Sequence, residues 1–554
     1  MTTPSLDELI EAGSLTPALV DAVRLLHEIA RADPDAAPLA SLAMVLTLRA
    51  GEDGHSCLDL SDIDSFLPER DTSHVDPAAL RAQLVGVTAL VDASGADEPR
   101  PGIPFVLDDD RLYIARARAE ERAVAAALLR DGGSHLSVVL GGPGMGKTTR
   151  IAADLVRRFS AAPDVAVSVA LVAPTGKAAR RMREALENAF VTPPRDFPPF
   201  TDELRERILA ATTPRTVHKL LGYSPRRTPH FARRPGRPLD EDIVIVDEAS
   251  MMSLSLMHHL LAAMREDAEL WLVGDPDQLA SVDAGTVLGD IAAARATSPI
   301  IARRTDVLTA QHRFKEDSRI NRLVTAVRGL STSGSVDDVL TLLEDSGPDF
   351  EWIEPVENVA RLDAVTAEMI AIANRAAGAA AGGDFAGALS IHGEAQFLCA
   401  HRRGLLGVEG VNRVVRAGLV GEKGGEFYPG RPVMVTRNDD VLGLANGDVG
   451  IVCIDGDRRV VAFPGPDGPR VIPVVRLSGL ETVHALTIHK SQGSEYDHAI
   501  VVLPRGDSRI LTRELFYTGI SRPKKRLTVV ATREAVATAL GRPVRRATGL
   551  RSLL

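Results

Sequence analysis

The apolar residues in the central part of the chain follow first a strand pattern and then a helical one. Residues 136–140 are apolar or small, and a glycine-rich turn comes directly after them. Ile151, Leu155, Val156 and Phe159 then recur at the spacing of one helix face. This order of strand, turn and helix predicts the first unit of a parallel α/β domain.

The same alternation continues and predicts two α/β domains, one over residues 111–305 and one over residues 306–554. Strands that alternate with helices indicate a doubly wound parallel sheet. The further strands are expected at 165–172, 243–246, 269–273, 397–400, 483–487, 498–503 and 527–531.

Three stretches depart from this alternation. Residues 425–478 hold short β-branched runs separated by Asn-Gly and Asp-Gly turns, so a small antiparallel barrel or sheet is expected inside the second α/β domain. Residues 223–240 are irregular, basic and rich in proline, which favours either a solvated loop or a pin that faces nucleic acid. Residues 371–389 are rich in Ala and Gly and predict a loose helix or a linker.

Residues 1–110 form a separate, acidic unit. Helical spacing at 19–32 and 39–49 predicts a small, mostly helical domain that ends in the turn-rich stretch 92–104. This unit has 21 Asp and Glu against 6 Arg and no Lys, whereas the rest of the chain has 58 basic and 53 acidic residues. Such a charge disfavours contact with a phosphate backbone, so we expect the unit to dock on a protein partner.

Composition excludes several other classes of protein. No run of about 18 apolar residues occurs, and the first residues lack the basic and apolar regions of a signal peptide, so a cytoplasmic protein is expected. Cys57, Cys399 and Cys453 are far apart and lack metal-ligand spacing, so we expect buried, reduced thiols.

The glycine-rich turn carries the strongest chemical signal. Gly141-x-x-x-x-Gly146-Lys147-Thr148 fits the phosphate-binding loop pattern at every fixed position. Backbone N–H groups and a helix N-terminus suit a polyphosphate, while Lys147 suits its β and γ phosphates and the Thr148 hydroxyl suits Mg²⁺. The residues expected to bind the nucleotide are Gly141, Gly142, Pro143, Gly144, Met145, Gly146, Lys147, Thr148 and Thr149.

Polar residues at the ends of later strands add to this site. Asp247 and Glu248 follow the strand at 243–246, where an Asp can hold the Mg²⁺ shell and a Glu can activate water. The alternative is a pair of surface acids at the start of a loop. Gln278 follows the next strand and is a candidate sensor of the γ-phosphate. Thr175 and Lys177 either face a ligand or cap a helix.

These stretches together resemble the superfamily 1 helicases, in the branch that moves 5′→3′. Within that branch they resemble the RecD-type alpha subunits of exodeoxyribonuclease V, the RecBCD helicase–nuclease. The GHSCLDL stretch resembles the N-terminal domain of such subunits. The other matching stretches are GGPGMGKTT, APTGKAA, TVHKLLGY, VIVDEASM, GDPDQLASVDAGTVLGDI, GRPVMVTRNDDVLGLANGDVGIV, LTIHKSQGSEYD and YTGISRPKKRL.

The resemblance implies an α/β fold of two RecA-like P-loop domains that bind ATP and Mg²⁺ between them. It further implies an SH3-like insertion at about 425–478, a short pin at about 223–240 and a small, mostly helical N-terminal domain. Thr148 and Asp247 would hold Mg²⁺, Arg313 and Arg522 would be arginine fingers from the far side of the cleft, and Glu495 would lie near the ribose. The implied catalytic residues are Lys147, Asp247, Glu248, Gln278, Arg313 and Arg522.

The resemblance also implies a DNA strand as substrate and protein partners. RecB-like and RecC-like subunits would complete a heterotrimer that unwinds DNA in double-strand break repair and homologous recombination, with no membrane involved. The residues implied to touch single-stranded DNA are Pro174, Thr175, Lys177, His218, Thr487, His489, Lys490, Ser491 and Gln492.

Two observations restrict the activities expected of this chain: one concerns recognition of adenine and the other concerns nuclease activity. The family has a Gln upstream of the phosphate loop that reads adenine, whereas residues 120–124 contain none and place Arg122 there. None of the eight Lys follows an acidic residue by two positions, so we expect the nuclease activity to belong to a partner subunit. The alternatives to a subunit of a complex are a stand-alone 5′→3′ helicase and a mainly regulatory subunit with weak ATPase activity.

Overall fold

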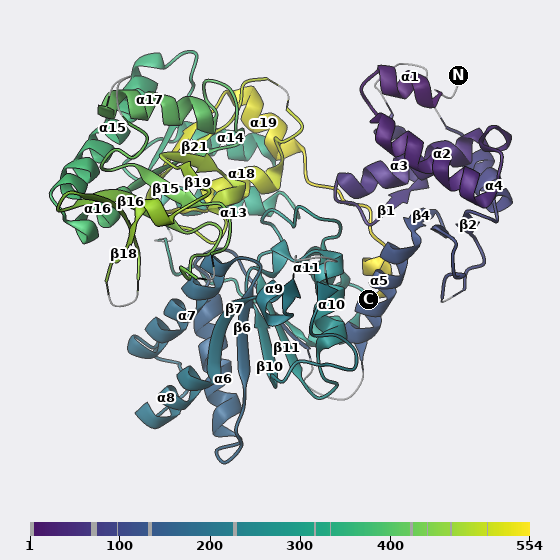
Figure 1. The fold of residues 1–554 in the computed structure, drawn as a ribbon, viewed down its shortest axis with the longest axis horizontal. Coiled ribbons are helices and arrows are strands. Elements are labelled where there is room, and N and C mark those ends of the chain that lie inside the picture. The colour runs from purple at the N-terminus through teal and green to yellow at the C-terminus, as the bar shows by residue number, and fades with distance from the viewer. Residues whose placement is uncertain are drawn as a thin grey trace.

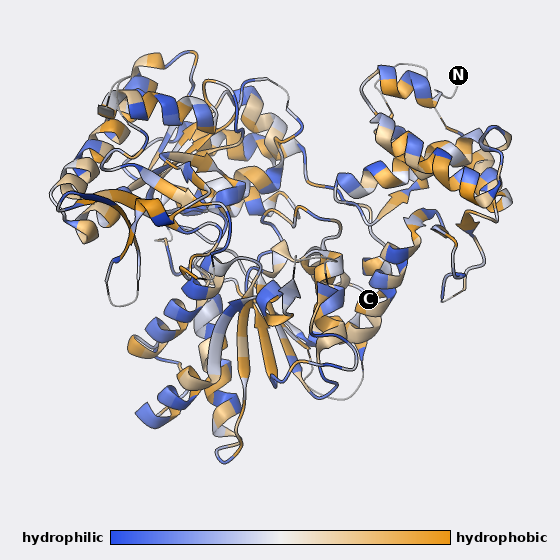
Figure 2. Ribbon diagram, in the orientation of Figure 1, coloured by the Kyte–Doolittle hydropathy of each residue, from blue (hydrophilic) through white to orange (hydrophobic). Residues whose placement is uncertain are grey.

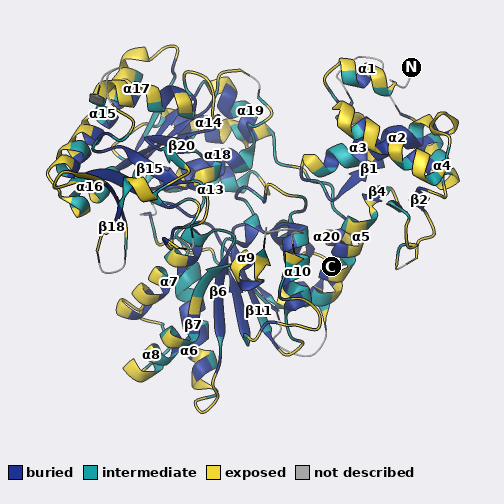
Figure 3. Cartoon of the chain, in the orientation of Figure 1, coloured by how far each residue is buried: buried dark blue, intermediate teal, exposed yellow. Residues whose placement is uncertain are grey.

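The structure is a computed structural model that describes residues 5–67, 75–96, 98–130, 136–224, 230–314, 317–332, 334–420, 425–439, 441–465, 468–506 and 508–554. An N-terminal unit stands beside two α/β domains that face each other (Figure 1). The strands of both large sheets are buried and apolar, and the outer helix faces are exposed and hydrophilic (Figures 2 and 3). Within the described residues, no helix has the length and apolar content needed to cross a membrane.

The N-terminal unit packs helices against a small sheet. Prolines in the first turn start α2 to α4, where a missing N–H costs nothing, and the middle of α3 is buried almost completely. The predicted helical character is confirmed, but the four-stranded sheet β1-β4-β3-β2 was not expected. The elements are α1 (Leu6–Glu11), α2 (Pro17–Ala30), α3 (Pro38–Glu52), β1 (Cys57–Asp59), α4 (Pro77–Gly86), β2 (Val91–Asp92), β3 (Phe105–Asp108) and β4 (Arg111–Ile114).

The first α/β domain is a six-stranded parallel sheet in the order β12-β5-β11-β10-β6-β7. Helices α6 to α8 cover one face, and α5, α10 and α11 cover the other. The strands are β5 (Leu136–Leu140), β6 (Val169–Ala173), β7 (Thr212–Thr216), β10 (Ile243–Val246), β11 (Glu269–Gly274) and β12 (Thr305–Val307). The helices are α5 (Ala115–Leu129), α6 (Lys147–Ser160), α7 (Gly176–Val191), α8 (Asp202–Ala211), α9 (Val217–Leu220), α10 (Leu254–Ala263), α11 (Val287–Ala294) and α12 (Pro299–Arg303).

The second α/β domain has a five-stranded parallel sheet in the order β13-β22-β21-β14-β20. The strands are β13 (Phe350–Ile353), β14 (Ala395–Cys399), β20 (Ala485–Thr487), β21 (Tyr496–Val502) and β22 (Pro523–Val530). The helices are α13 (Arg319–Gly329), α14 (Val336–Glu344), α15 (Val359–Ala381), α16 (Phe385–His392), α17 (Val408–Val420), α18 (Arg513–Ile520) and α19 (Arg533–Gly541). The Ala-rich stretch is therefore two helices rather than a linker, because its small side chains, such as Ala376 and Ala380, are buried against neighbouring elements.

Both predicted insertions have strands. The expected antiparallel sheet inside the second α/β domain is confirmed, in the order β18-β17-β16-β15-β19, with apolar side chains such as Val433 and Val452 at its core. In the pin-like stretch, β8 (Tyr223–Ser224) pairs with β9 (His230–Phe231), and its residues 225–229 lie outside the described part. The inserted strands are β15 (Pro432–Val435), β16 (Val449–Asp455), β17 (Arg458–Phe463), β18 (Arg470–Pro473) and β19 (Leu480–Thr482).

The predicted domain boundaries shift at three places. Strand β4 pairs with β1 and β3, so the N-terminal unit extends to Ile114. Strand β12 pairs with β5, so the first α/β domain includes Val307. Residues 542–554, here called the C-terminal segment, leave the second α/β domain and cross to the first, where α20 (Leu550–Leu553) packs on α5 and α11 (Figure 1).

The C-terminal segment is held by polar contacts on two units. The Arg546 guanidinium donates to the backbone oxygens of Ser281, Asp283 and Gly285. The backbone N–H of Ala547 donates to His55 Nδ1 in the N-terminal unit. The segment therefore joins the N-terminal unit, the first α/β domain and the end of the second.

Two buried carboxyl groups lie under this segment. The Thr548 hydroxyl donates toward Glu121 Oε1 at 3.0 Å and lies 3.2 Å from Asp290 Oδ2. Burial, together with the nearby Glu121 charge, raises the pKa of Asp290 to about 7, although the Thr548 hydrogen bond opposes this. Asp290 is therefore largely protonated below neutral pH in the folded chain.

This arrangement predicts a pH-dependent stability that Asp290→Asn removes. The folded pKa lies above the unfolded value of 3.8, so the folded state holds the proton more tightly, and the contribution of Asp290 to stability falls as pH rises from about 4 to about 7. We expect the variant to melt roughly 2–5 °C above wild type at pH 8, with a smaller or no advantage at pH 5. Thermal unfolding at both pH values measures this, with Asp363→Asn on the exposed face of α15 as control. An equal effect at both pH values would contradict the assignment.

The three cysteines meet their prediction. Cys57, Cys399 and Cys453 are buried and unpaired. Burial raises the pKa of each thiol, to about 12 for Cys57 and Cys399 and about 11 for Cys453, so none is a reactive thiolate at neutral pH.

Candidate nucleotide and nucleic-acid site

A cavity of about 1020 Å³ lies where the two α/β domains meet. Loop residues 143–149 line it, whereas Gly141 and Gly142 lie behind Lys147. Residues far apart in the sequence complete the lining. The structure thus brings together the predicted Lys147, Thr148, Asp247, Glu248, Gln278, Arg313, Glu495 and Arg522.

The phosphate loop connects β5 to α6. Gly144 and Gly146 have φ of 77° and 78°, a region that favours glycine, and a Cβ on Gly144 would overlap the Arg313 side chain. Lys147 Nζ donates to the backbone oxygens of Gly141 at 2.6 Å and Gly142 at 3.0 Å. The loop thus presents backbone N–H groups and a helix N-terminus to the cavity, which suits an anion.

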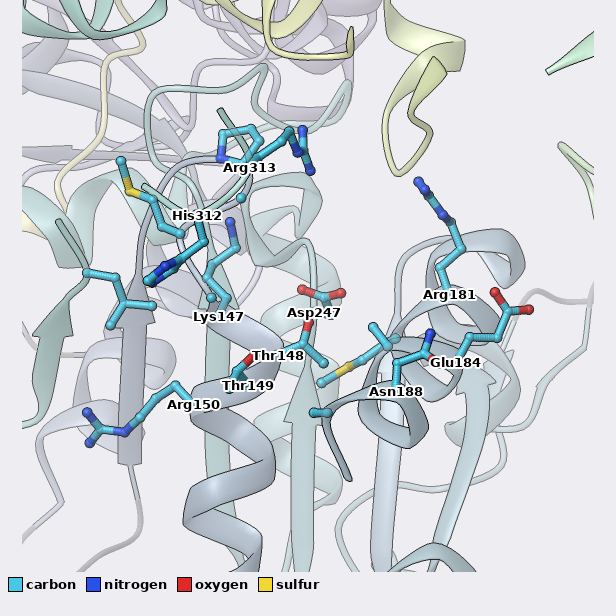
Figure 4. Close-up of a pocket in the computed structure, with 18 of the residues that line it drawn as sticks. Lys147, Thr148, Thr149, Arg150, Arg181, Glu184, Asn188, Asp247, His312 and Arg313 are labelled. Carbon is cyan, nitrogen blue, oxygen red and sulfur yellow. The ribbon is translucent and has the colours of Figure 1, made fainter. Parts of the chain in front are cut away.

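Two carboxylates follow β10 at the floor of the cavity. Burial and the adjacent Glu248 raise the pKa of Asp247, while Lys147 and Arg181 lower it. Glu248 has a φ of 50°, an uncommon backbone conformation for a residue with a Cβ. Thr148 and Asp247 both line the cavity, as Figure 4 shows. This paired negative charge beside a hydroxyl fits a divalent cation such as Mg²⁺.

A chain of hydrogen bonds crosses from the second α/β domain to Gln278. Arg522 donates to Gln278 Oε1 at 2.7 Å, and Gln278 Nε2 donates to Asp275 Oδ2 at 3.1 Å. The Tyr517 hydroxyl, from α18, donates to the same Asp275 oxygen at 3.0 Å. Any movement between the domains must therefore change the surroundings of Gln278.

Arg313 and Glu495 face each other across the cavity. The Arg313 guanidinium pairs with Glu495, and Arg181 Nη2 lies 3.5 Å from the other Glu495 oxygen. Burial alone would raise the pKa of Glu495, but these arginines outweigh it and the pKa is lowered. Arg313 does not come from the far domain: it lies on the connection between the domains, where the neighbouring His312 N–H donates to Gly144 O. The expected contact of Glu495 with a ribose stays a prediction.

Residues 120–124, where the family has its adenine-reading Gln, lie away from this cavity. Instead, Glu121 is fully buried and accepts hydrogen bonds from the Ser56 and Thr548 hydroxyls and from Gly549 N. This helix turn therefore holds the N-terminal unit and the C-terminal segment together.

In the first α/β domain, the residues predicted to touch single-stranded DNA lie around the start of α7 and α9. Thr175 caps α7 by accepting from Ala178 N, so the capping interpretation holds. Burial, with Arg181 and Arg180 nearby, lowers the pKa of Lys177 to about 8. His218 joins a ring cluster, 5.4 Å from Tyr223 and 6.1 Å from Phe231. Pro174 is partly exposed.

The residues predicted in the second α/β domain divide into two groups. Thr487 and Lys490 line a second cavity of about 390 Å³ together with Arg402, Arg413 and Arg416. His489 is half-buried nearby.

Two of the residues predicted to touch single-stranded DNA donate hydrogen bonds within the protein. Ser491 is fully buried and donates to Ile488 O. Gln492 Nε2 donates to Leu279 O of the first α/β domain at 3.1 Å. Both side chains have partners inside the protein, Ser491 within its own turn and Gln492 at the contact between domains. Their contact with single-stranded DNA stays a prediction.

Sequence reasoning missed three residues that line or support the nucleotide site. Arg181 lines the cavity, whereas Asp275 bonds to Gln278 and Tyr517 bonds to Asp275. Asp275 and Tyr517 lie inside stretches that resemble helicases, and Arg181 comes two positions after the end of the APTGKAA stretch. A polar residue near a strand end was the available signal for Asp275. The directions of Arg181 and Tyr517 depend on how the domains pack, which the sequence pattern does not contain.

Comparisons with known proteins show which families the chain is similar to. Three family models match: an AAA domain at residues 121–284, a UvrD-like helicase C-terminal domain at residues 482–530, and "RecBCD enzyme subunit RecD, N-terminal domain" at residues 11–113. The RecBCD enzyme subunit RecD of Mycolicibacterium smegmatis is 38% identical over 99% of this chain and 99% of its own length.

More distant relatives extend the comparison. The RecBCD enzyme subunit RecD of Haemophilus influenzae is 32% identical over 78% of this chain and 71% of its own. The ATP-dependent RecD2 DNA helicase of Deinococcus radiodurans is 32% identical over 81% of this chain but 54% of its own. Among solved structures, a Bacteroides Pif1 helicase in complex with ADP-AlF3 and ssDNA covers 74% of this chain and 92% of its own, at 18% identity and a TM-score of 0.39.

Proposed function

The chain belongs to the RecD family of RecBCD enzyme subunits, and on this basis we propose that it is an ATP-dependent DNA helicase subunit that moves 5′→3′ along single-stranded DNA. The observation that carries this proposal is a cavity between the two α/β domains that gathers the predicted nucleotide residues. A site divided between two domains changes shape as nucleotide binds and leaves, and that movement can drive translocation.

The residues of the cavity suit hydrolysis of ATP. Glu248 accepts a proton from a water molecule, whose oxygen bonds to the γ-phosphorus as the bond to the β–γ bridging oxygen breaks, giving ADP and phosphate. Lys147, Arg313 and Arg522 stabilise the charge that develops on the phosphate oxygens. Thr148 and Asp247 would hold Mg²⁺, which supplies positive charge to the β and γ phosphates.

The surroundings of the residues predicted to touch DNA, on both α/β domains, support a nucleic-acid substrate. Thr487 and Lys490 share their cavity with three arginines, which suits a phosphate backbone. On the first α/β domain, Tyr223 is 41% exposed and sits 5.4 Å from Phe231, which offers a ring face to a base. His218 lies 5.4 Å from Tyr223. Pro174, Thr175 and Lys177 lie at and just before the start of α7. Because backbone contacts and stacking dominate, sequence preference is weak.

RecB-like and RecC-like subunits are the partners that the family membership supports, in a complex for double-strand break repair and homologous recombination. The acidic N-terminal unit matches the RecD N-terminal family model and is the proposed docking unit. A stand-alone helicase is less well supported, because the chain spans only 54% of the RecD2 helicase that it resembles. A regulatory role with weak ATPase activity is disfavoured by the complete set of nucleotide residues.

Purification from the native cell followed by an unwinding assay tests this function. A tagged chain is expected to co-purify with two larger subunits. The purified chain alone is expected to open duplexes that carry a 5′ single-stranded tail, with ATP and Mg²⁺, and to leave 3′-tailed duplexes closed. It should not degrade linear DNA. Unwinding from 3′ tails alone would refute the polarity, and degradation that persists in Lys147→Ala would refute the absence of a nuclease site.

A further inference from the structure

The first two turns of helix α7 carry the proposed contacts with single-stranded DNA, a residue that lines the nucleotide cavity and two contacts with the second α/β domain. Its N-cap Thr175 and the neighbouring Lys177 are proposed strand contacts. One turn later come two adjacent arginines that both cross to the second α/β domain. Arg180 pairs with Asp448 in the turn before β16, and Arg181 donates to the backbone oxygen of Gly493.

Arg181 also belongs to the nucleotide cavity. It lines the cavity with Lys147 and Asp247, and it is one of the charges that lower the pKa of Asp247. Figure 4 shows its side chain rising from α7 on the opposite side of Asp247 from Lys147. Its side chain is 34% exposed, so the guanidinium remains accessible from the cavity.

The contacts of Arg181 depend on domain closure. The first α/β domain contains Lys147, Asp247 and Arg181, so the arrangement of these three residues does not depend on the second α/β domain. Gly493 and Glu495 belong to the second, and Glu495 is also the partner of Arg313. Arg181 therefore loses both partners when the domains separate, and it helps to fix the carboxylate that holds Arg313 when they close.

We propose that Arg181 is a positioning residue for ATP hydrolysis: it holds the loop of Gly493 and Glu495 over the γ-phosphate side of the closed cleft and thereby places Arg313. A guanidinium suits this task, because its fork of donors can bind a backbone oxygen and a carboxylate at the same time. This inference rests on the proposed ATPase function. It adds no chemical step, and binding of the nucleotide remains with the phosphate loop.

Steady-state kinetics of Arg181→Ala, Arg181→Lys and Arg180→Ala test the proposal. With saturating single-stranded DNA, Arg181→Ala should lower kcat about 10- to 100-fold, while the Kd for a fluorescent ATP analogue changes less than about threefold. Arg181→Lys should recover part of kcat, because an ammonium keeps the charge but not the fork. Arg180→Ala removes the same charge from the adjacent position and should keep kcat within about threefold of wild type.

A double-mutant cycle with Glu495→Gln separates positioning from helix damage. If Arg181 acts through Glu495, the double variant should lose less kcat than the product of the two single losses. A kcat of Arg181→Ala within threefold of wild type would overturn the role of Arg181. Equal losses of kcat in Arg180→Ala and Arg181→Ala would overturn it as well. Fully multiplicative losses in the cycle would overturn the route through Glu495. Absence of DNA-stimulated hydrolysis in the wild-type chain would overturn the proposed function itself, and this inference with it.

Discussion

Replacing Lys147 with glutamine is expected to reduce DNA-stimulated ATP hydrolysis by roughly 10³-fold or more while the fold stays intact. The Lys147 side chain reaches over the loop, where its Nζ donates to the oxygens of Gly141 and Gly142. A glutamine amide retains donors of similar reach but carries no charge. The γ-phosphate then loses its fixed cation from the phosphate loop.

Hydrolysis rates and thermal unfolding of the same preparation test this expectation. Lys525→Gln is the matched control, because that side chain is 74% exposed and pairs with Asp497 away from the cavity. The control should hydrolyse ATP at the wild-type rate, and both variants should melt close to wild type. Hydrolysis by Lys147→Gln within tenfold of wild type would show that the phosphate site lies elsewhere.

Arg522→Ala is expected to bind ATP but to lose about 10³-fold in hydrolysis. Arg522 is 3% exposed and lies at the wall opposite the phosphate loop, where it donates to Gln278 Oε1 and to Thr518 O. The phosphate loop and Lys147 retain the nucleotide without it. The developing charge of the transition state, however, loses a guanidinium that the closed cleft would supply.

Because Arg522 is buried, its variant needs a control for folding. Arg526→Ala is the control, because Arg526 lies on the same strand, β22, and pairs with Glu368 outside the cavity lining. Circular dichroism, melting temperature and nucleotide affinity should be measured for both. An Arg522→Ala protein that folds normally but no longer binds nucleotide would contradict the assigned role.

The nucleotide site was predictable because its chemistry is local. Each strand of a parallel sheet delivers the residues that follow it to the same edge, so Asp247, Glu248 and Gln278 meet the phosphate loop once the strands are recognised. The antiparallel insertion was likewise visible, because Asn-Gly and Asp-Gly turns separate its β-branched runs.

The structural features that could not be predicted from the sequence depend on tertiary packing. Strand β7 begins with the polar Thr212 and has little apolar character, yet β6 pairs with it and makes it a strand. Ser491 and Gln492 belong to a matched helicase stretch, but that match carries no information about the direction of their side chains. The course of the C-terminal segment depends on Arg546 reaching three backbone oxygens of a distant loop.

The C-terminal segment gives the two α/β domains a second connection, in addition to the chain between β12 and α13. It continues covalently from the second domain, and the packing of α20 on α5 and α11 holds its end on the first. Its eight residues from 542 to 549 span at most about 28 Å, which limits how far their two anchors can separate. Two links at different places leave a hinge free to rotate about the line that joins them, whereas a single link permits twisting in any direction. We therefore expect the segment to limit how far the two α/β domains separate and twist while α20 stays packed on the first domain.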